Sequence, residues 1–315
     1  MNRIRKIGEF WLFHTIQGAL GLLLVLLALI VAVFGRFAAS EESSVTHLGA
    51  ILQAPSTAHP FGTDDVGRDL LSRVIDGAGY TIPAAIAVVA ASVIIGSVVG
   101  VVAGYYGGWV NETLMRITDI FLSYPSMLLA IAVAASLGSG LKQTAIALIV
   151  VVWAAYARLA QVQTSAVRHR LFMDASEMAS SSVTTRLFRH VLPNALPPVF
   201  VKATMDVAMC VEWIAALGFV GLGARPPAPE WGTMIAEARE YVLNAWWYVT
   251  FPSLALLFVV LGFNYLGGAL DTHFFGTTRT LSRKSLRQLA LVSDEAVAVS
   301  ETIVEPVTAD EELIP

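Results

Sequence analysis

Charged residues are scarce in this chain of 315 residues. Only 14% are Asp, Glu, Lys or Arg, whereas typical soluble proteins have about 25%. Hydrophobic residues make up 56%, a surplus that one water-soluble core of this size cannot bury. The single cysteine, Cys210, excludes an internal disulfide bond. These shortages exclude a soluble globular protein and predict an all-α, polytopic membrane protein.

Motifs for nucleotide binding and catalysis are also missing. A Walker A loop needs Gly-Lys-Ser/Thr to hold phosphates. None of the four lysines of this chain follows a glycine: Lys6, Lys142, Lys202 and Lys284. The sequence has no HExxH motif, no Ser/His/Asp set and no basic stripe with interleaved aromatic residues. We therefore expect a chain that is not an enzyme, binds no nucleic acid, and holds no cofactor or metal of its own.

Six apolar stretches have the length of a membrane-spanning helix. They lie at 16–36, 81–104, 120–137, 143–162, 197–221 and 246–270. The first is longer than the apolar core of a secretory signal, so we interpret it as a retained anchor, with a cleaved signal peptide as the alternative. Before the second stretch, the apolar residues of 70–75 predict a short helix on the bilayer surface.

The distribution of Lys and Arg predicts the orientation. Basic residues gather before the first stretch, between the fourth and fifth, and after the sixth, which all lie on one side if there are six spans. That side is predicted to be cytoplasmic, with both termini inside. We expect three parts: residues 1–80 with the anchor and an outer loop, a five-helix core at 81–270 with a cytoplasmic loop at 164–196, and a disordered acidic tail at 271–315.

The segment at 164–196 is the most informative part of the chain. Residues 174–193 read DASEMASSSVTTRLFRHVLP, which predicts a helix with small residues at its start, a basic stretch, and an end at Pro193. Small side chains would let another protein approach the helix closely. An amphipathic helix lying on anionic lipid is the alternative interpretation.

Seven segments resemble, in order, parts of one known family. They are PFGTDDVGRDLLSR at 60–73, AGYYGGWVNETLMR at 103–116, YPSMLLA at 124–130, WAAYARL at 153–159, FRHVLPNALPP at 188–198, GFVGLGARPPAPEWGTMIAEAR at 218–239 and FPSLALLFVVLGFNYLGGAL at 251–270. The family is the inner-membrane permease subunit of bacterial ABC importers of the peptide/nickel class. The chain is similar to its second permease, the C-type of dipeptide and oligopeptide systems.

This resemblance implies a type I importer fold with about six transmembrane helices and transport by alternating access. Two permeases would form the pore, two cytoplasmic subunits would bind ATP and Mg²⁺, and an external substrate-binding protein would deliver the substrate. The family's coupling loop reads Glu-Ala-Ala, three residues, Gly, and later Leu-Pro. On this pattern the predicted ATPase-coupling residues are Asp174, Ala175, Ser176, Ser180, Arg189, Leu192 and Pro193.

Ionisable residues inside the fifth stretch suggest a translocation pathway. Asp206, Met209 and Cys210 share one helical face, while Glu212 faces elsewhere. A carboxylate beside a thioether and a thiol could contact a soft metal ion, but Asp206 could equally pair with Lys202 while its neighbours fill space. The substrate is therefore predicted to be di- or oligopeptides, with nickel or a metal chelate as the alternative.

Overall fold

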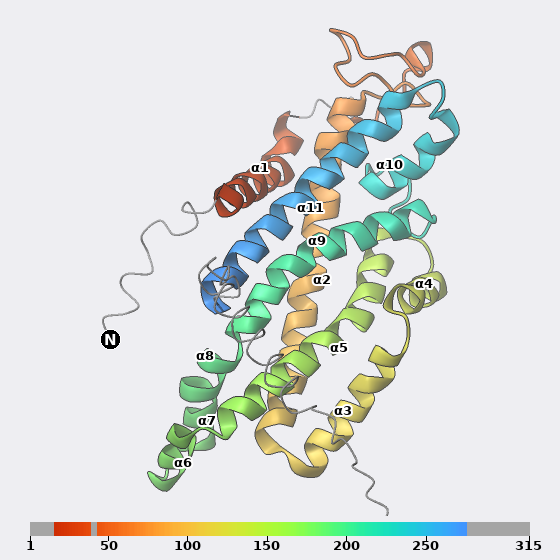
Figure 1. Cartoon of the computed structure of the whole chain (residues 1–315). Helices are drawn as coiled ribbons and strands as arrows, with labels where there is room; N and C mark the ends of the chain where they lie inside the picture. The colour runs from red at the N-terminus through yellow and green to blue at the C-terminus, as the bar shows by residue number, and fades with distance from the viewer. Residues whose placement is uncertain (1–15, 39–42, 276–315) are drawn as a thin grey trace, which may run out of the picture. The chain divides into compact units, whose positions relative to one another are not determined.

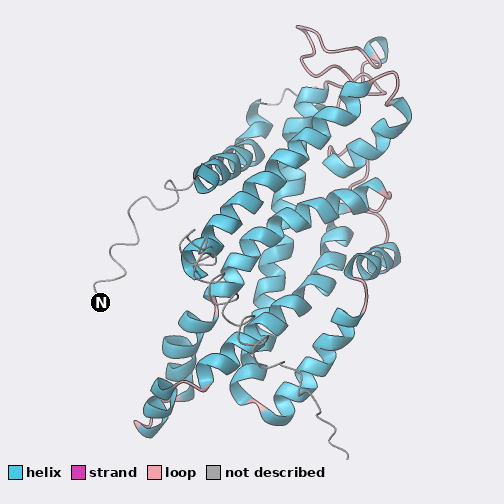
Figure 2. Ribbon diagram, viewed as in Figure 1, coloured by secondary structure: helices cyan, strands magenta, loops and turns pink. Residues whose placement is uncertain are grey.

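Every regular element of the residues that the computed structural model describes, 16–38 and 43–275, is a helix (Figures 1 and 2). The long helices are α1 (Ile16–Ala38), α2 (Leu70–Tyr106), α5 (Leu141–Arg168), α9 (Pro197–Phe219) and α11 (Trp246–Phe275). The shorter ones are η4 (Leu48–Ala50), α3 (Gly108–Ser123), α4 (Ser126–Leu137), α6 (Leu171–Met178), α7 (Val183–Arg186), η5 (Leu187–Val191), α8 (Leu192–Ala195), α10 (Trp231–Ala238) and η6 (Arg239–Tyr241). The predicted acidic tail lies outside the described residues, apart from 271–275 at the end of α11.

Four of the described helices, α1, α2, α5 and α11, are long and apolar enough to cross a membrane. The bent pair of α3 and α4 would make a fifth. Helix α9 has 23 residues and coincides with the fifth apolar stretch, but it is more polar because it carries Lys202, Asp206 and Glu212. The all-α, polytopic fold class is thus confirmed.

Two predicted boundaries are wrong. The third apolar stretch, 120–137, is not one helix: α3 ends at Ser123 and α4 begins at Ser126, with an angle of 88° between them. The cause is Pro125, which disfavours helical backbone at the residue before it, and Tyr124 is indeed extended. Residues 70–75 do not form a separate surface helix either, since they are the first turns of the 37-residue α2.

The core depends on a close approach of α2 and α5. Gly96, Gly100 and Gly104 lie four residues apart, so they form a smooth strip along α2. A methyl group at Gly96 would stand 2.5 Å from the carbonyl oxygen of Trp153, and one at Gly104 would stand 2.6 Å from that of Gln161. The two backbones therefore touch along about two helical turns, and no larger residue fits between them.

Figure 1 shows α3 and α4 alongside α5, and the remaining short helices at the two ends of the bundle. Helices α6, α7 and α8 lie together at one end. The segment 43–69 and α10 lie at the opposite end, next to the start of α11. These two ends carry most of the polar contacts, and the long helices join them.

Candidate functional site

The first candidate is the arm, which we define as residues 171–195 between α5 and α9. The predicted single helix at 174–193 is wrong, because the arm consists of four short helices, α6, α7, η5 and α8. It turns at Ser180, whose N–H donates to the carbonyl of Glu177 at 2.9 Å. Pro193 does not end a helix, because helical backbone continues through it from η5 into α8.

Ser180 explains why the related motif has glycine at this place. Its φ is +55°, in the left-handed region that side chains with a Cβ rarely adopt. The turn therefore requires the backbone freedom that glycine has and serine lacks. The arm carries a strained residue at its corner.

The predicted coupling residues are mostly accessible. Asp174 and Ala175 are exposed on α6, Ser180 on the turn, Arg189 on η5 and Pro193 on α8, while Ser176 and Leu192 are half-buried. Sequence reasoning missed the large apolar side chains that stand beside them. Leu171, Met178 and Phe188 are 86%, 81% and 68% exposed, so the arm presents an apolar surface that none of the described residues covers.

One ion pair holds the arm together. Arg186 Nη1 on α7 lies 2.8 Å from Glu177 Oε1 on α6, across the turn at Ser180. This guanidinium lowers the pKa of the Glu177 carboxyl, mainly through their hydrogen bond. Since Glu177 is exposed, the pair fixes the shape of the turn more than it stabilises the fold.

The residues predicted for a pathway lie mainly between α5 and α9. Asp206 and Cys210 are buried, Met209 is half-buried and Glu212 is exposed. Lys202 Nζ lies 2.9 Å from Asp206 and 5.6 Å from the centre of the Tyr156 ring. The structure thus shows the Lys202–Asp206 pairing that the sequence left as an alternative, and separates Glu212 from it.

The end of the bundle opposite the arm contains a buried charge network, which the sequence reasoning did not find. Arg73 on α2 is only 1% exposed and lies 3.3 Å from Asp64 and 3.4 Å from Glu237 of α10. Arg68 completes it, 2.5 Å from Asp64 and 3.8 Å from Glu237. Burial raises the pKa of Glu237, and the two arginines oppose that shift.

Tryptophan and carboxylate hydrogen bonds fasten the same end. Trp231 donates to the carbonyl of Val74 at 2.9 Å, and Trp247 donates to that of Thr63 at 3.2 Å. Glu230 is fully buried and accepts from the first N–H groups of α10, as an N-terminal cap does. The segment 59–76, α10 and the start of α11 are therefore bound into one unit.

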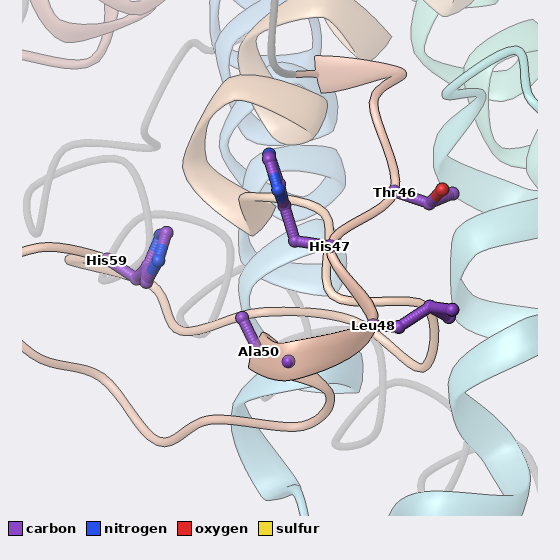
Figure 3. Close-up of a pocket in the computed structure, with 6 residues that line it drawn as sticks. Thr46, His47, Leu48, Ala50 and His59 are labelled. Carbon is purple, nitrogen blue, oxygen red and sulfur yellow. The ribbon is translucent and has the colours of Figure 1, made fainter.

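A depression on segment 43–69 is lined by Thr46, His47, Leu48, Gly49, Ala50 and His59 (Figure 3). His59 Nδ1 lies 3.0 Å from Asp69 Oδ1, and Asp69 caps the start of α2. In the part of the chain that the structure describes, no three His, Cys, Asp or Glu side chains converge as metal ligands. The His59–Asp69 contact thus serves to fasten this segment to α2.

Several long apolar helices, with an accessible arm at one end and a buried charge network at the other, are typical of a multi-pass membrane protein. The chain belongs to the family described as binding-protein-dependent transport system inner membrane component, whose model matches residues 96–278. It is therefore an inner-membrane, multi-pass component of such a system, and the predicted family is confirmed.

Several curated relatives are similar over most of their length. The probable D,D-dipeptide transport system permease protein DdpC of Escherichia coli (strain K12) is 41% identical over 247 residues, 78% of this chain and 83% of the relative. The dipeptide permease DppC of Alkalihalophilus pseudofirmus is 38% identical, covering 79% and 82%. The glutathione permease GsiD of Pectobacterium atrosepticum is 36% identical, covering 83% and 88%.

The fold is shared with a solved structure. The MetNI methionine ABC transporter, in an inward-facing conformation, matches with a TM-score of 0.51 and 22% identity, covering 67% of this chain and 97% of that chain. This likeness confirms the predicted type I importer fold.

Proposed function

We propose that this chain is one of two permease subunits of an importer that moves di- and oligopeptides across the cytoplasmic membrane. The observation that carries the proposal is the 36–41% identity to relatives named for dipeptides, D,D-dipeptides and glutathione, over about four fifths of the chain. No observation favours the nickel alternative. In this proposal a second permease completes the pore and an external binding protein delivers the peptide.

The arm is the surface on which a cytoplasmic ATP-hydrolysing subunit docks. Its exposed apolar side chains, Leu171, Met178 and Phe188, would be unfavourable in water and suit a protein partner. Asp174 and Ala175 lie on the same short helix, α6, and are exposed. ATP and Mg²⁺ are held by that partner, and both termini of this chain lie on the same side as the arm.

Transport follows from how the arm is connected. The arm continues directly from α5, and α5 touches the backbone of α2 along the glycine strip. Closure of the partner subunits on ATP would push the arm, and α5 with α2 would tilt as one body. Such a rocking motion opens the pathway first to one side and then to the other.

The test is co-purification of the transporter from cells that express this chain with its neighbouring subunits. ATPase activity should rise when the external binding protein is loaded with di- or tripeptides, and should not rise with nickel chelates. A preparation that responds only to the metal form would contradict the peptide proposal.

A variant tests the docking surface separately. Asp174→Arg with Ala175→Glu should abolish association of the ATPase subunit and leave membrane insertion intact, because both residues are exposed. Leu243→Glu is the matched control: Leu243 is 97% exposed at the opposite end of the bundle, so ATPase association should persist. If the double variant still bound the ATPase subunit normally, the arm would not be its docking surface.

A further inference from the structure

Helices α2 and α5 run parallel and end side by side next to the arm. The glycine strip of α2 meets α5 in the same order along both helices, Gly96 at Trp153 and Gly104 at Gln161. The last carbonyl groups of a helix lack N–H partners within it and carry a partial negative charge. Two such ends side by side repel each other, and Arg168 in the last turn of α5 supplies a positive charge there.

Arg168 contacts the end of α2 directly. Although the residue is exposed overall, its Nη1 donates to the backbone carbonyl of Tyr105. The guanidinium also lies 5.7 Å from the centre of the Tyr105 ring, and Tyr105 is only 8% exposed. A guanidinium can make both contacts because it is planar and has several N–H donors. Arg168 therefore caps α2 from the neighbouring helix.

This contact is made where α2 turns into α3. Gly107 begins the turn with a φ of +67°, and a methyl group added to it would stand 3.2 Å from Arg168 Nη1. Beside the turn, Ala103 of α2, Met115 of α3 and Ala157 of α5 are buried together. Arg168 thus holds the corner at which three helices meet.

The same residue adjoins the arm. Only two residues separate Arg168 from the start of α6, and the N–H of Arg170 donates to the carbonyl of Val167 at 3.2 Å, which keeps this link short. The hydrogen bond from Arg186 lowers the pKa of the Glu177 carboxyl, and the positive charge of Arg168 adds to that shift. Arg168 therefore lies between the ion pair of the arm and the end of α2.

The glycine strip alone does not fix how α2 and α5 move together. Small residues give a smooth surface that lets two helices approach closely, but packed helices can still slide past each other in a shear motion. A hydrogen bond is directional, so the contact of Arg168 with Tyr105 fixes the end of α5 against the end of α2. A push along α5 then reaches α2 and the start of α3.

We propose that Arg168 is a positioning residue for transport, because it makes the α2–α3 turn follow the arm when the ATPase subunits close. This inference rests on the proposed function of the arm. Without the contact, the ATPase subunits would still dock and hydrolyse ATP. Helices α2 and α3 would follow the movement of α5 incompletely, so fewer peptides would cross for each ATP hydrolysed.

Three variants of the complete transporter in lipid vesicles test this role. Arg168→Gln removes the guanidinium, and Arg168→Lys keeps the charge. Arg170→Gln is the matched control: it removes the same charge two residues away, from a side chain that is exposed and does not cap α6. Uptake of the dipeptide Ala-Ala and ATP hydrolysis are measured together and expressed as a ratio.

We expect Arg168→Gln to assemble and to hydrolyse ATP. Its uptake per ATP should fall at least about tenfold, the factor by which one hydrogen bond from a charged donor shifts an equilibrium. Arg168→Lys should recover part of the ratio, because an ammonium group can donate to the Tyr105 carbonyl but lacks the planar fork of a guanidinium. Arg170→Gln should keep the normal ratio.

Hydrogen exchange distinguishes a positioning role from a structural one. Trapping the ATPase subunits with ATP and vanadate should change the exchange of amides 104–112 in the unsubstituted and Arg170→Gln proteins, and not in Arg168→Gln. Amides of the arm should respond in all three, because docking is unaffected. A contact that only stabilised α2 would alter exchange at 104–112 equally with and without nucleotide.

Several results would overturn the inference. A normal ratio in Arg168→Gln, with a normal response at 104–112, would mean that the contact only caps α2. An equal loss in Arg170→Gln would mean that surface charge is responsible. If Arg168→Gln does not assemble, Arg168→Lys decides, since a normal ratio there would contradict the role. If the unsubstituted transporter takes up no peptide, the peptide function is refuted instead, and the exchange experiment still tests Arg168.

Discussion

The two ends of the helix bundle differ in how far their side chains find partners within the chain. At the α10 end, charged and aromatic side chains satisfy one another inside the chain: Arg73 is 1% exposed, Asp64 is fully buried, and both contact charged partners. At the arm, an ion pair with an exposed carboxylate spans the turn, and large apolar side chains point outward. The polar groups of the first end are paired within the chain, whereas the arm leaves an apolar surface on which we propose that the ATPase subunit docks.

The largest loss of stability is expected from breaking the buried Arg73–Asp64–Glu237 network at the α10 end. Arg73→Met would leave Asp64 and Glu237 with one arginine fewer, and removing one partner of a buried ion pair costs about 3–5 kcal/mol. Thermal unfolding of the purified chain should show a large fall in Tm. Arg239→Ala, which removes a 63% exposed arginine at the same end, should leave Tm unchanged. Equal shifts for the two variants would mean that the network is not what holds this end.

A smaller loss of stability is expected from filling the glycine strip of α2, where this helix contacts the backbone of α5. Gly96→Val would push the side chain into the backbone of α5 at Trp153, and overpacking of this kind costs about 1–3 kcal/mol. Both Tm and transport should fall, since α2 and α5 would separate. Gly268→Ala in α11 is the control, because nothing lies within 4 Å of its added methyl group. Unchanged transport by Gly96→Val would contradict the tilting of α2 with α5.

At the arm, a stabilising change is expected. Ser180→Gly relieves a left-handed residue, worth up to about 1 kcal/mol. The gain should appear as slower proteolysis of the arm and not as a change in global Tm. Ser181→Gly, one position further on and without positive φ, should instead make the arm slightly more sensitive. Faster cleavage of the Ser180→Gly variant would show that the turn is not strained.

The smallest effect is expected from the ion pair of the arm. Arg186→Ala should speed hydrogen exchange across α6 and α7 without changing Tm, because Glu177 is exposed. The pH dependence has a definite sign: Arg186 lowers the pKa of Glu177 below its usual 4.5, so the pair is present at neutral pH. It should be lost as the pH falls through that lowered value, and acid should therefore affect the unsubstituted arm more than the variant.

Composition and periodicity were enough to predict the helices, because apolar length alone decides whether a segment can cross a membrane. The same signal could not show the break at Tyr124–Pro125, since apolar residues lie on both sides of it. The same signal predicted one helix over 174–193. In the structure Ser180 and its neighbours form a turn, which the positive φ of Ser180 shows. Local residue preference cannot reveal a left-handed serine.

The sites were predicted unevenly for a related reason. The coupling residues were found because they form a continuous motif. The Arg73–Asp64–Glu237 network joins residues up to 164 positions apart, and the sequence does not show that these residues meet.

The length of α2 has a consequence for the lipid around it. Its 37 residues measure about 55 Å, and the eleven residues at 70–80 precede its apolar stretch, adding about 16 Å beyond the hydrocarbon layer. Headgroups occupy only roughly 5–7 Å on each side. The helix therefore rises about 10 Å above them, and any molecule that arrives at that face meets protein before it meets lipid, so the composition of that leaflet should matter little to its arrival.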